Sequence, residues 1–145
     1  MVNAKDVAEF FVMKGIQDEE GAGISNLKLQ KLLYYAKGFH LALFDQALFD
    51  EKLWAWTHGP VVPVMYHEYK TYGAGPITHL QYDPIAKFDE EQLELLNEVW
   101  SVFGQFSAWK LRDMSHNEKP WLDHEGDASM IEDYELASYF KTRVK

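Results

Sequence analysis

The chain has 145 residues and a formal net charge of −9, and 47% of its residues are apolar and 15% aromatic. This length suits one domain with a sizeable core, and the apolar content excludes a disordered chain. The absence of cysteine excludes disulfides and thiolate metal sites. The acidic balance disfavours DNA or RNA as a partner, because phosphate contacts need clustered Lys and Arg.

The N-terminal sequence lacks the basic and apolar regions of a signal peptide, and no apolar run is long enough to span a bilayer. We therefore expect a cytoplasmic protein without a membrane partner, in which residues 1–145 form a single domain. The negative charge has two interpretations. It keeps the protein in solution, or it speeds association with a basic protein surface.

The first predicted helix begins at Asn3, whose side chain can cap it, and Asp6 completes a capping-box arrangement three residues later. Apolar residues follow at helical spacing. Gly15 is the predicted C-terminal stop. Residues 17–23 are polar, acidic and glycine-rich, which predicts an exposed loop.

The second predicted helix runs from Ser25 or Asn26 to about residue 44 and is apolar on two sides. A broad face carries most of its leucines, and Gln30, Lys31, Lys37 and Gly38 lie opposite. A narrow apolar line of Leu27, Tyr34 and Leu41 runs inside that polar face. A helix of this kind is usually central. The line either packs within the domain or forms a docking surface for a partner helix.

A strand, a sharp corner and a helix are predicted within residues 53–69. Residues 53–56 are aromatic and apolar, which suits a strand. Gly59 and Pro60 break it, and Pro63 fits the first turn of a helix, where its missing N–H has no partner. Aromatic residues crowd around this corner, so another part of the chain must cover it.

The remaining chain predicts three helices joined by polar segments. Residues 77–82 form a short strand or an irregular segment, and Asp89 caps a long helix with acidic residues in its first turn. Ser107 caps a short helix whose apolar residues include Trp109, and residues 115–121 form a polar turn. Asp133 caps the last helix. The whole chain is predicted to be mainly α, a compact domain of about six helices with a small β element.

Histidine is the one residue type that raises the question of a metal site. His58 and His116 could meet at the corner, but a two-histidine site would still need a carboxylate, and the spacing of the histidines does not resemble that of metal ligands. His40 lies on an apolar helix face and is predicted to be a hydrogen-bonded core residue. His116 also has a structural interpretation, as a residue that hydrogen-bonds backbone in the turn. We expect no cofactor, no metal and no catalytic residue.

Three stretches resemble the signatures of one family. Ala55-Trp56-x-x-Gly59-Pro60-Val61-x-Pro63-x-x-Tyr66 is similar to the central signature of the Panacea-domain antitoxins, the SocA-like and often phage-associated proteins. The stretches 27–36 and 111–121 resemble the flanking signatures of the same family, in the same order. Together they span most of the chain.

The resemblance implies an antitoxin of a two-gene toxin–antitoxin module, not an enzyme, that neutralises its neighbour by direct protein contact. The cognate toxin, encoded by the adjacent gene, is expected to have a basic surface because it acts on RNA, nucleotides or the ribosome, and an acidic, aromatic-lined face would block that surface. The predicted partner contacts are Lys31, Tyr34, Tyr66, Tyr69 and His116. The residues assigned to the fold signature are Leu29, Leu32, Trp56, Gly59, Pro60, Val61, Pro63, Pro120 and Trp121.

Two other functions remain open at this point. The chain could be an adaptor that delivers a bound protein to a protease, which predicts faster loss of that protein in cells. It could also be a metal-dependent hydrolase, which predicts stoichiometric metal and dependence on His58 or His116.

Overall fold

The computed structural model describes residues 2–18 and 23–144, and in them it shows a mainly α fold with a small β element, as predicted. Seven α-helices and five short strands occur in this part of the chain, and α6 is the helix that the sequence analysis did not separate from the polar turn at 115–121. The helices are α1 (Ala4–Gln17), α2 (Asn26–Phe44), α3 (Pro63–Glu68), α4 (Glu90–Phe103), α5 (Ala108–Ser115), α6 (Lys119–Leu122) and α7 (Asp133–Lys141), with 3-10 turns η1 (Lys70–Tyr72) and η2 (Ile85–Lys87). The strands are β1 (Ile24–Ser25), β2 (Leu53–Trp56), β3 (Gly59–Val61), β4 (Pro76–Ile77) and β5 (Met130–Ile131).

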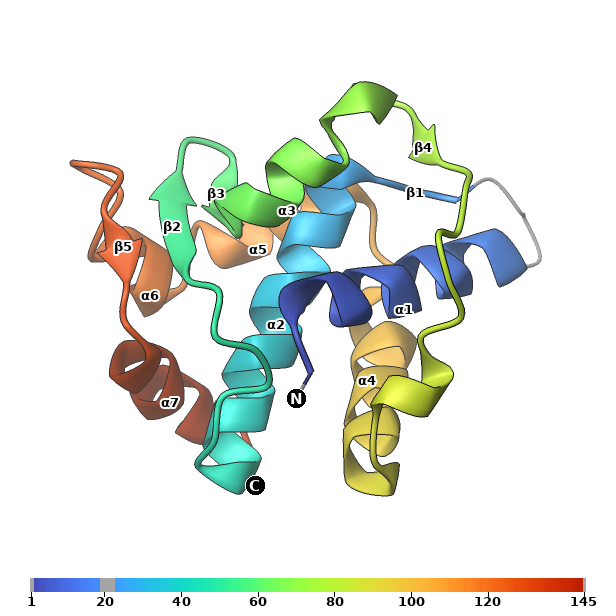
Figure 1. The fold of residues 1–145 in the computed structure, drawn as a ribbon. Helices are drawn as coiled ribbons and strands as arrows, with labels where there is room; N and C mark the ends of the chain where they lie inside the picture. Colours follow the sequence, from blue (N-terminus) through green and yellow to red (C-terminus); the bar gives the residue numbers. More distant parts are fainter. Residues whose placement is uncertain (1, 19–22, 145) are drawn as a thin grey trace.

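Helix α2 runs through the middle of the molecule (Figure 1), where it contacts α1, α4, α5, α7 and β3. The polar face predicted for α2 is buried, because Gln30, Lys31 and Lys37 are each 0% exposed. Other elements cover this side, so every polar head needs a partner inside the protein. The Lys37 ammonium, for example, donates to the Glu51 carbonyl at 2.8 Å and lies 3.0 Å from the Asp133 carboxylate.

The helix starts follow local capping chemistry. The capping boxes predicted at Asn3 and Asp89 are both present, and Ser25 and Ser107 accept the expected backbone N–H bonds at the starts of α2 and α5. These bonds satisfy N–H groups that have no partner within the helix. Asp133 is different, because it is the first residue of α7 and no side chain caps that helix.

Residues 53–61 form a hairpin, which corrects the predicted Gly-Pro corner. β2 pairs antiparallel with β3 on one side and with β5 on the other, and the register places Trp56 opposite Gly59 and Ala55 opposite Pro60. The chain reverses at Thr57 and His58, so Gly59 and Pro60 belong to the return strand. Helix α3 then begins at Pro63, as predicted.

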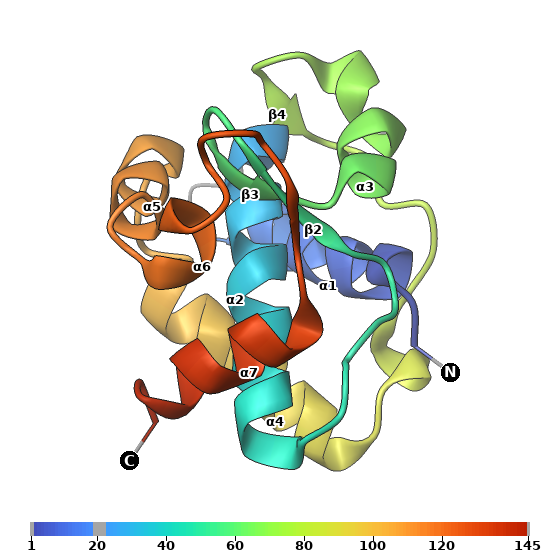
Figure 2. The same cartoon turned by 90° about the vertical axis from the view of Figure 1, so that its left-hand side faces the viewer.

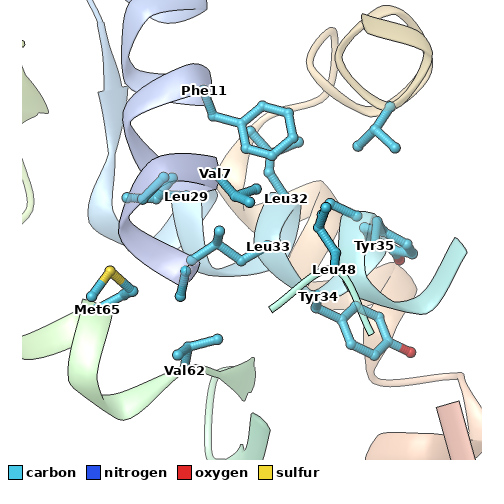
Figure 3. Close-up of a cluster of buried hydrophobic side chains, with 14 of the residues drawn as sticks. Val7, Phe11, Leu29, Leu32, Leu33, Tyr34, Tyr35, Leu48, Val62 and Met65 are labelled. Carbon is cyan, nitrogen blue, oxygen red and sulfur yellow. The ribbon is translucent and has the colours of Figure 1, made fainter. Parts of the chain in front are cut away.

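The buried apolar residues form one connected cluster around α2. Leu29, Leu32 and Leu33 meet Val7 and Phe11 of α1 on one side and Val62 and Met65 on another (Figure 3). Toward α4 and α7 the packing is aromatic, with the Tyr35 ring stacked on Phe103 at 4.0 Å and the Tyr34 ring edge-on to Phe140 at 5.3 Å.

Two predicted segments differ in extent from the structure. α1 continues two residues beyond Gly15, to Gln17. In the segment 77–82 only Ile77 is a strand residue, within β4, which pairs with β1. The predicted loop at 17–23 falls partly outside the described residues. No helix in the ranges 2–18 and 23–144 is long and apolar enough to cross a membrane.

Candidate functional site

The β2–β3 hairpin presents two tryptophans away from the core. Leu53 and Ala55 of β2 point inward, whereas Trp54 is 39% exposed and Trp56 is partly buried, as strand alternation requires. The Trp56 ring meets Tyr66 of α3 edge-on, with the ring centroids 5.3 Å apart. Figure 2 shows the hairpin between α5 and α3.

A pocket of about 760 Å³ opens beside this hairpin. The start of α2, the hairpin, α3, the segment after η1 and the start of α5 all contribute to it. Its walls are mostly apolar, and none of the residues that line it is Asp, Glu, Lys or Arg. The lining residues are Ser25, Asn26, Leu27, Gln30, Trp56, Thr57, His58, Val61, Tyr66, Gly73, Ala74, Ala108, Trp109 and Ala128.

Two amides of α2 hold the floor of the pocket. The Gln30 side chain accepts from the Val62 N–H at 2.9 Å and donates to the Asn26 side chain at 3.0 Å. Asn26 in turn donates to the Tyr66 carbonyl at 3.0 Å. These bonds fix the end of the hairpin and α3 against α2, so the wall of the pocket is attached to the central helix.

Lys31 of α2 holds the hairpin through its return strand. Its ammonium donates to the Pro60 carbonyl at 2.8 Å. Burial and, to a smaller extent, the charge of nearby Arg112 lower the pKa of Lys31 to about 7. Gly59 has a φ of +108°, and a Cβ there would stand 2.6 Å from Lys31 Cε and 2.9 Å from Ser115 Oγ. Only glycine therefore lets the hairpin lie this close to α2.

Trp109 and His58 form one edge of the pocket, and Arg112 contacts both of them. Trp109 is 60% exposed, and its ring meets His58 edge-on at 6.0 Å. The Arg112 guanidinium lies 5.2 Å from the Trp109 ring centroid, a cation–π distance, and its Nε donates to His58 Nδ1 at 3.4 Å. This edge places one aromatic surface and one cation at the mouth of the pocket.

The turn after α5 is locked against the hairpin. The Trp121 indole donates to the Trp56 carbonyl at 2.8 Å, and the His116 ring stacks on Trp121 at 3.9 Å. Burial lowers the pKa of His116, and the charges of Arg112 and Lys31 add to this effect. Glu118, just beyond, is buried and accepts from the hydroxyls of Tyr34 and Tyr35.

Three predicted partner contacts need correction. Lys31, Tyr34 and Tyr69 are each 0% exposed, so none of them presents its side chain to a partner. Tyr34 donates to Glu118 at 2.8 Å and Tyr69 to Glu9 at 2.6 Å, and burial raises the pKa of both phenols. Tyr34 and Leu41 of the predicted apolar line on α2 therefore pack within the molecule, whereas Leu27 lines the pocket.

The other two predicted contacts, Tyr66 and His116, are partly exposed. Tyr66 lines the pocket, whereas His116 lies behind it on Trp121. The residues assigned to the fold signature surround the hairpin: Leu29, Leu32, Gly59, Pro60, Val61, Pro120 and Trp121 are buried, and Trp56 and Pro63 are partly buried.

Trp109 is a site residue that was not predicted from the sequence, where it stands among the apolar residues of a short predicted helix. Leu111 is 0% exposed and Trp109 is 60% exposed. Residues two apart do not share a helix face, so this spacing alone could have separated them.

The two predicted histidine positions do not form a ligand set. His58 contacts Trp109 and Arg112, and His116 contacts Trp121. Within the described ranges, no three residues of the types His, Cys, Asp and Glu lie close enough together to hold a metal ion. His40 is a buried residue whose ring nitrogen is hydrogen-bonded to the Gln46 carbonyl at 2.6 Å, as predicted for this histidine.

Together, these features describe a helical protein with a central buried helix, a hairpin held against that helix and a mostly apolar pocket beside the hairpin. The chain belongs to the family described as antitoxin SocA-like, Panacea domain, which matches residues 29–122. It is 33% identical over 109 residues to antitoxin SocA of Caulobacter vibrioides (strain NA1000 / CB15N). This match covers 68% of the chain but only 58% of the length of that relative. No solved structure matches the chain significantly.

Proposed function

We propose that this protein is an antitoxin that neutralises the toxin encoded beside it by direct binding, and that the aromatic pocket is the contact surface. Membership of the SocA-like family supports the role. The observation that carries the choice of surface is Trp109, a large aromatic side chain left 60% exposed at the mouth of a pocket of about 760 Å³.

Tryptophan and tyrosine dominate the binding energy of protein interfaces because they bury a large area at a small entropic cost. Trp109, Trp56 and Tyr66 all line the pocket. The clamp from α2 keeps the hairpin in place before binding, so little ordering is required when a partner docks.

The pocket differs in charge from the partner-binding face that the sequence predicted. The sequence predicted one face that is both acidic and aromatic, but no acidic residue lines the pocket. Exposed acids stand elsewhere, for example at Glu90, Glu91, Glu94 and Glu98 of α4. We therefore assign the anchoring contact to the pocket and the long-range attraction of a basic toxin to the overall charge of −9.

The test is co-expression with the protein of the adjacent gene. That protein alone should arrest growth, and the wild-type antitoxin should relieve the arrest and co-purify with it. Trp109→Ala should lose relief and weaken the complex by about thirtyfold or more, since anchor residues contribute roughly 2 kcal/mol or more.

Tyr134→Ala is the matched control. Tyr134 is 73% exposed on α7 and lies outside the aromatic pocket. Its loss should leave both growth relief and the complex unchanged. A harmless neighbour that does not co-purify would refute the proposal, and equal effects of the two variants would refute the choice of surface.

A further inference from the structure

The polar groups in the floor of the pocket are already paired. Gln30 uses both ends of its amide on Val62 and Asn26, and Asn26 uses its own amide nitrogen on Tyr66. Gln30 is 0% and Asn26 4% exposed. A polar group that entered this depth would lose its water and meet amides that already bond one another and the backbone, which costs free energy. The deep part of the pocket therefore favours an apolar group.

The walls and the size agree with an apolar guest. Leu27, Val61 and the rings of Trp56 and Trp109 face a volume of about 760 Å³. Pockets of roughly 300–1,000 Å³ accommodate drug-sized ligands, so this one can take one or two large side chains of a protein segment.

A cation, Arg112, lies beside the mouth of the pocket. Arg112 lies on Trp109 and His58, and its guanidinium is paired with Asp113 at 3.2 Å, where the Asp113 side chain is 67% exposed. An ion pair this open to water is weak. The Arg112 side chain is itself 26% exposed, so an incoming carboxylate can reach it.

We propose that the pocket binds a toxin segment in which an apolar side chain fills the pocket and a neighbouring carboxylate pairs with Arg112. This inference rests on the proposed function and specifies the chemistry of the bound segment. Arginine is suited to this task because its planar guanidinium binds a carboxylate through two parallel hydrogen bonds. The negative charge of the whole chain acts at long range and does not oppose this local pair, because salt screens it within about 10 Å.

Blocked pentapeptides test this chemistry without the toxin. The probes are acetyl-Gly-Leu-Gly-Glu-Gly-amide, the same peptide with Lys in place of Glu, and the same peptide with Ala in place of Leu. Titration is followed by the indole N–H signals of Trp56 and Trp109 in two-dimensional NMR. The Glu peptide should bind about fivefold more tightly than the Lys peptide at low salt, the size expected for one partly exposed ion pair. The Ala peptide should not shift either signal.

Variants at the edge assign the preference to Arg112. Arg112→Gln should bring the Glu-to-Lys ratio to about one, and Arg112→Lys should keep part of it. Lys110→Gln is the matched control, because Lys110 is an exposed cation two residues away on α5, and it should leave the ratio unchanged. Circular dichroism checks that each variant is folded.

Each remaining outcome decides the inference. No binding of the Glu peptide, equal binding of the Glu and Lys peptides, or preference for the Lys peptide would overturn it. Toxin binding that depends on Trp109 while the peptides show no preference would retain the proposed function and reject this chemistry. If the peptides bind with the expected preference but the protein of the adjacent gene does not bind, the proposed binding chemistry would stand and the proposed toxin partner would be rejected.

Discussion

At Gly59 the hairpin lies close to Lys31 of α2. Glycine is required there for two reasons. Its φ is +108°, a backbone conformation that residues with a side chain rarely adopt, and Lys31 and Ser115 leave no room for a Cβ. Gly59→Ala should therefore lower the free energy of unfolding by about 2–3 kcal/mol, measured by urea denaturation.

Variants at two other glycines distinguish the effect of the positive φ from the effect of close packing. Gly73 has a φ of +57°, but an added Cβ would meet nothing within 4 Å, and Gly126 has open space and no such φ. Gly73→Ala should cost less than Gly59→Ala, and Gly126→Ala should cost least. Equal melting of the Gly59 and Gly126 variants would contradict the account of the hairpin.

Lys31 makes stability depend on pH in the alkaline range. Its pKa is about 7 in the folded protein and near 10.5 when unfolded, so between these values the unfolded chain binds more protons. The destabilising cost of burying the charge is fully present below pH 7 and is relieved as the pH rises. Compared with Lys31→Met, the wild type should gain roughly 1 kcal/mol per pH unit within this window.

Denaturant unfolding of both proteins across this range measures the difference. Groups that titrate in both proteins cancel in the comparison. Lys70→Met, at an exposed lysine of η1, is the control and should show no such slope against the wild type. Parallel curves for the wild type and Lys31→Met would show that Lys31 keeps an ordinary pKa.

At the scale of elements, α2 packs against α7 by close approach at Gly38. A Cβ at Gly38 would overlap the Phe140 ring. Alanine favours helices by about 1 kcal/mol over glycine, but the overlap costs about 1–3 kcal/mol. Gly38→Ala should therefore lower the melting temperature even though it improves the helix itself.

A smaller partner should relieve this overlap. In the double variant Gly38→Ala with Phe140→Leu, the free energy of unfolding should fall by about 1 kcal/mol less than the sum of the two single losses. A thermal melt of the four proteins gives the coupling. If the losses in the free energy of unfolding were additive, the Phe140 ring of α7 would not restrict the side chain at position 38.

At the scale of the whole molecule, the charge of −9 should act on the rate of association. Glu94→Gln with Glu98→Gln removes two exposed charges from α4 without touching the pocket. The association rate with a basic toxin should fall about two- to threefold at low salt and converge with the wild type at high salt, while dissociation stays the same.

Stopped-flow or surface plasmon resonance measures both rates. Ser101→Ala, an exposed neutral change on α4, should alter neither. An unchanged or faster association of the double glutamine variant would argue against a basic partner surface.

The sequence by itself determined what depends on near neighbours. The caps at Asn3, Ser25, Asp89 and Ser107 and the start of α3 at Pro63 follow from bonds within one helical turn. The family resemblance through 55–66 also needed no coordinates, and the family match confirms it. The single-domain boundaries at 1–145 stay a prediction.

Only the tertiary structure decided which side chains are covered. Lys31, Tyr34 and Tyr69 look like surface residues in sequence, because polar and phenolic heads usually reach water. Here each head is paired by an element far along the chain, so burial is compatible with full hydrogen bonding. Trp109 shows the opposite behaviour, because it is an apolar residue that remains 60% exposed. Such pairings depend on contacts across 29 to 84 residues, which local patterns do not encode.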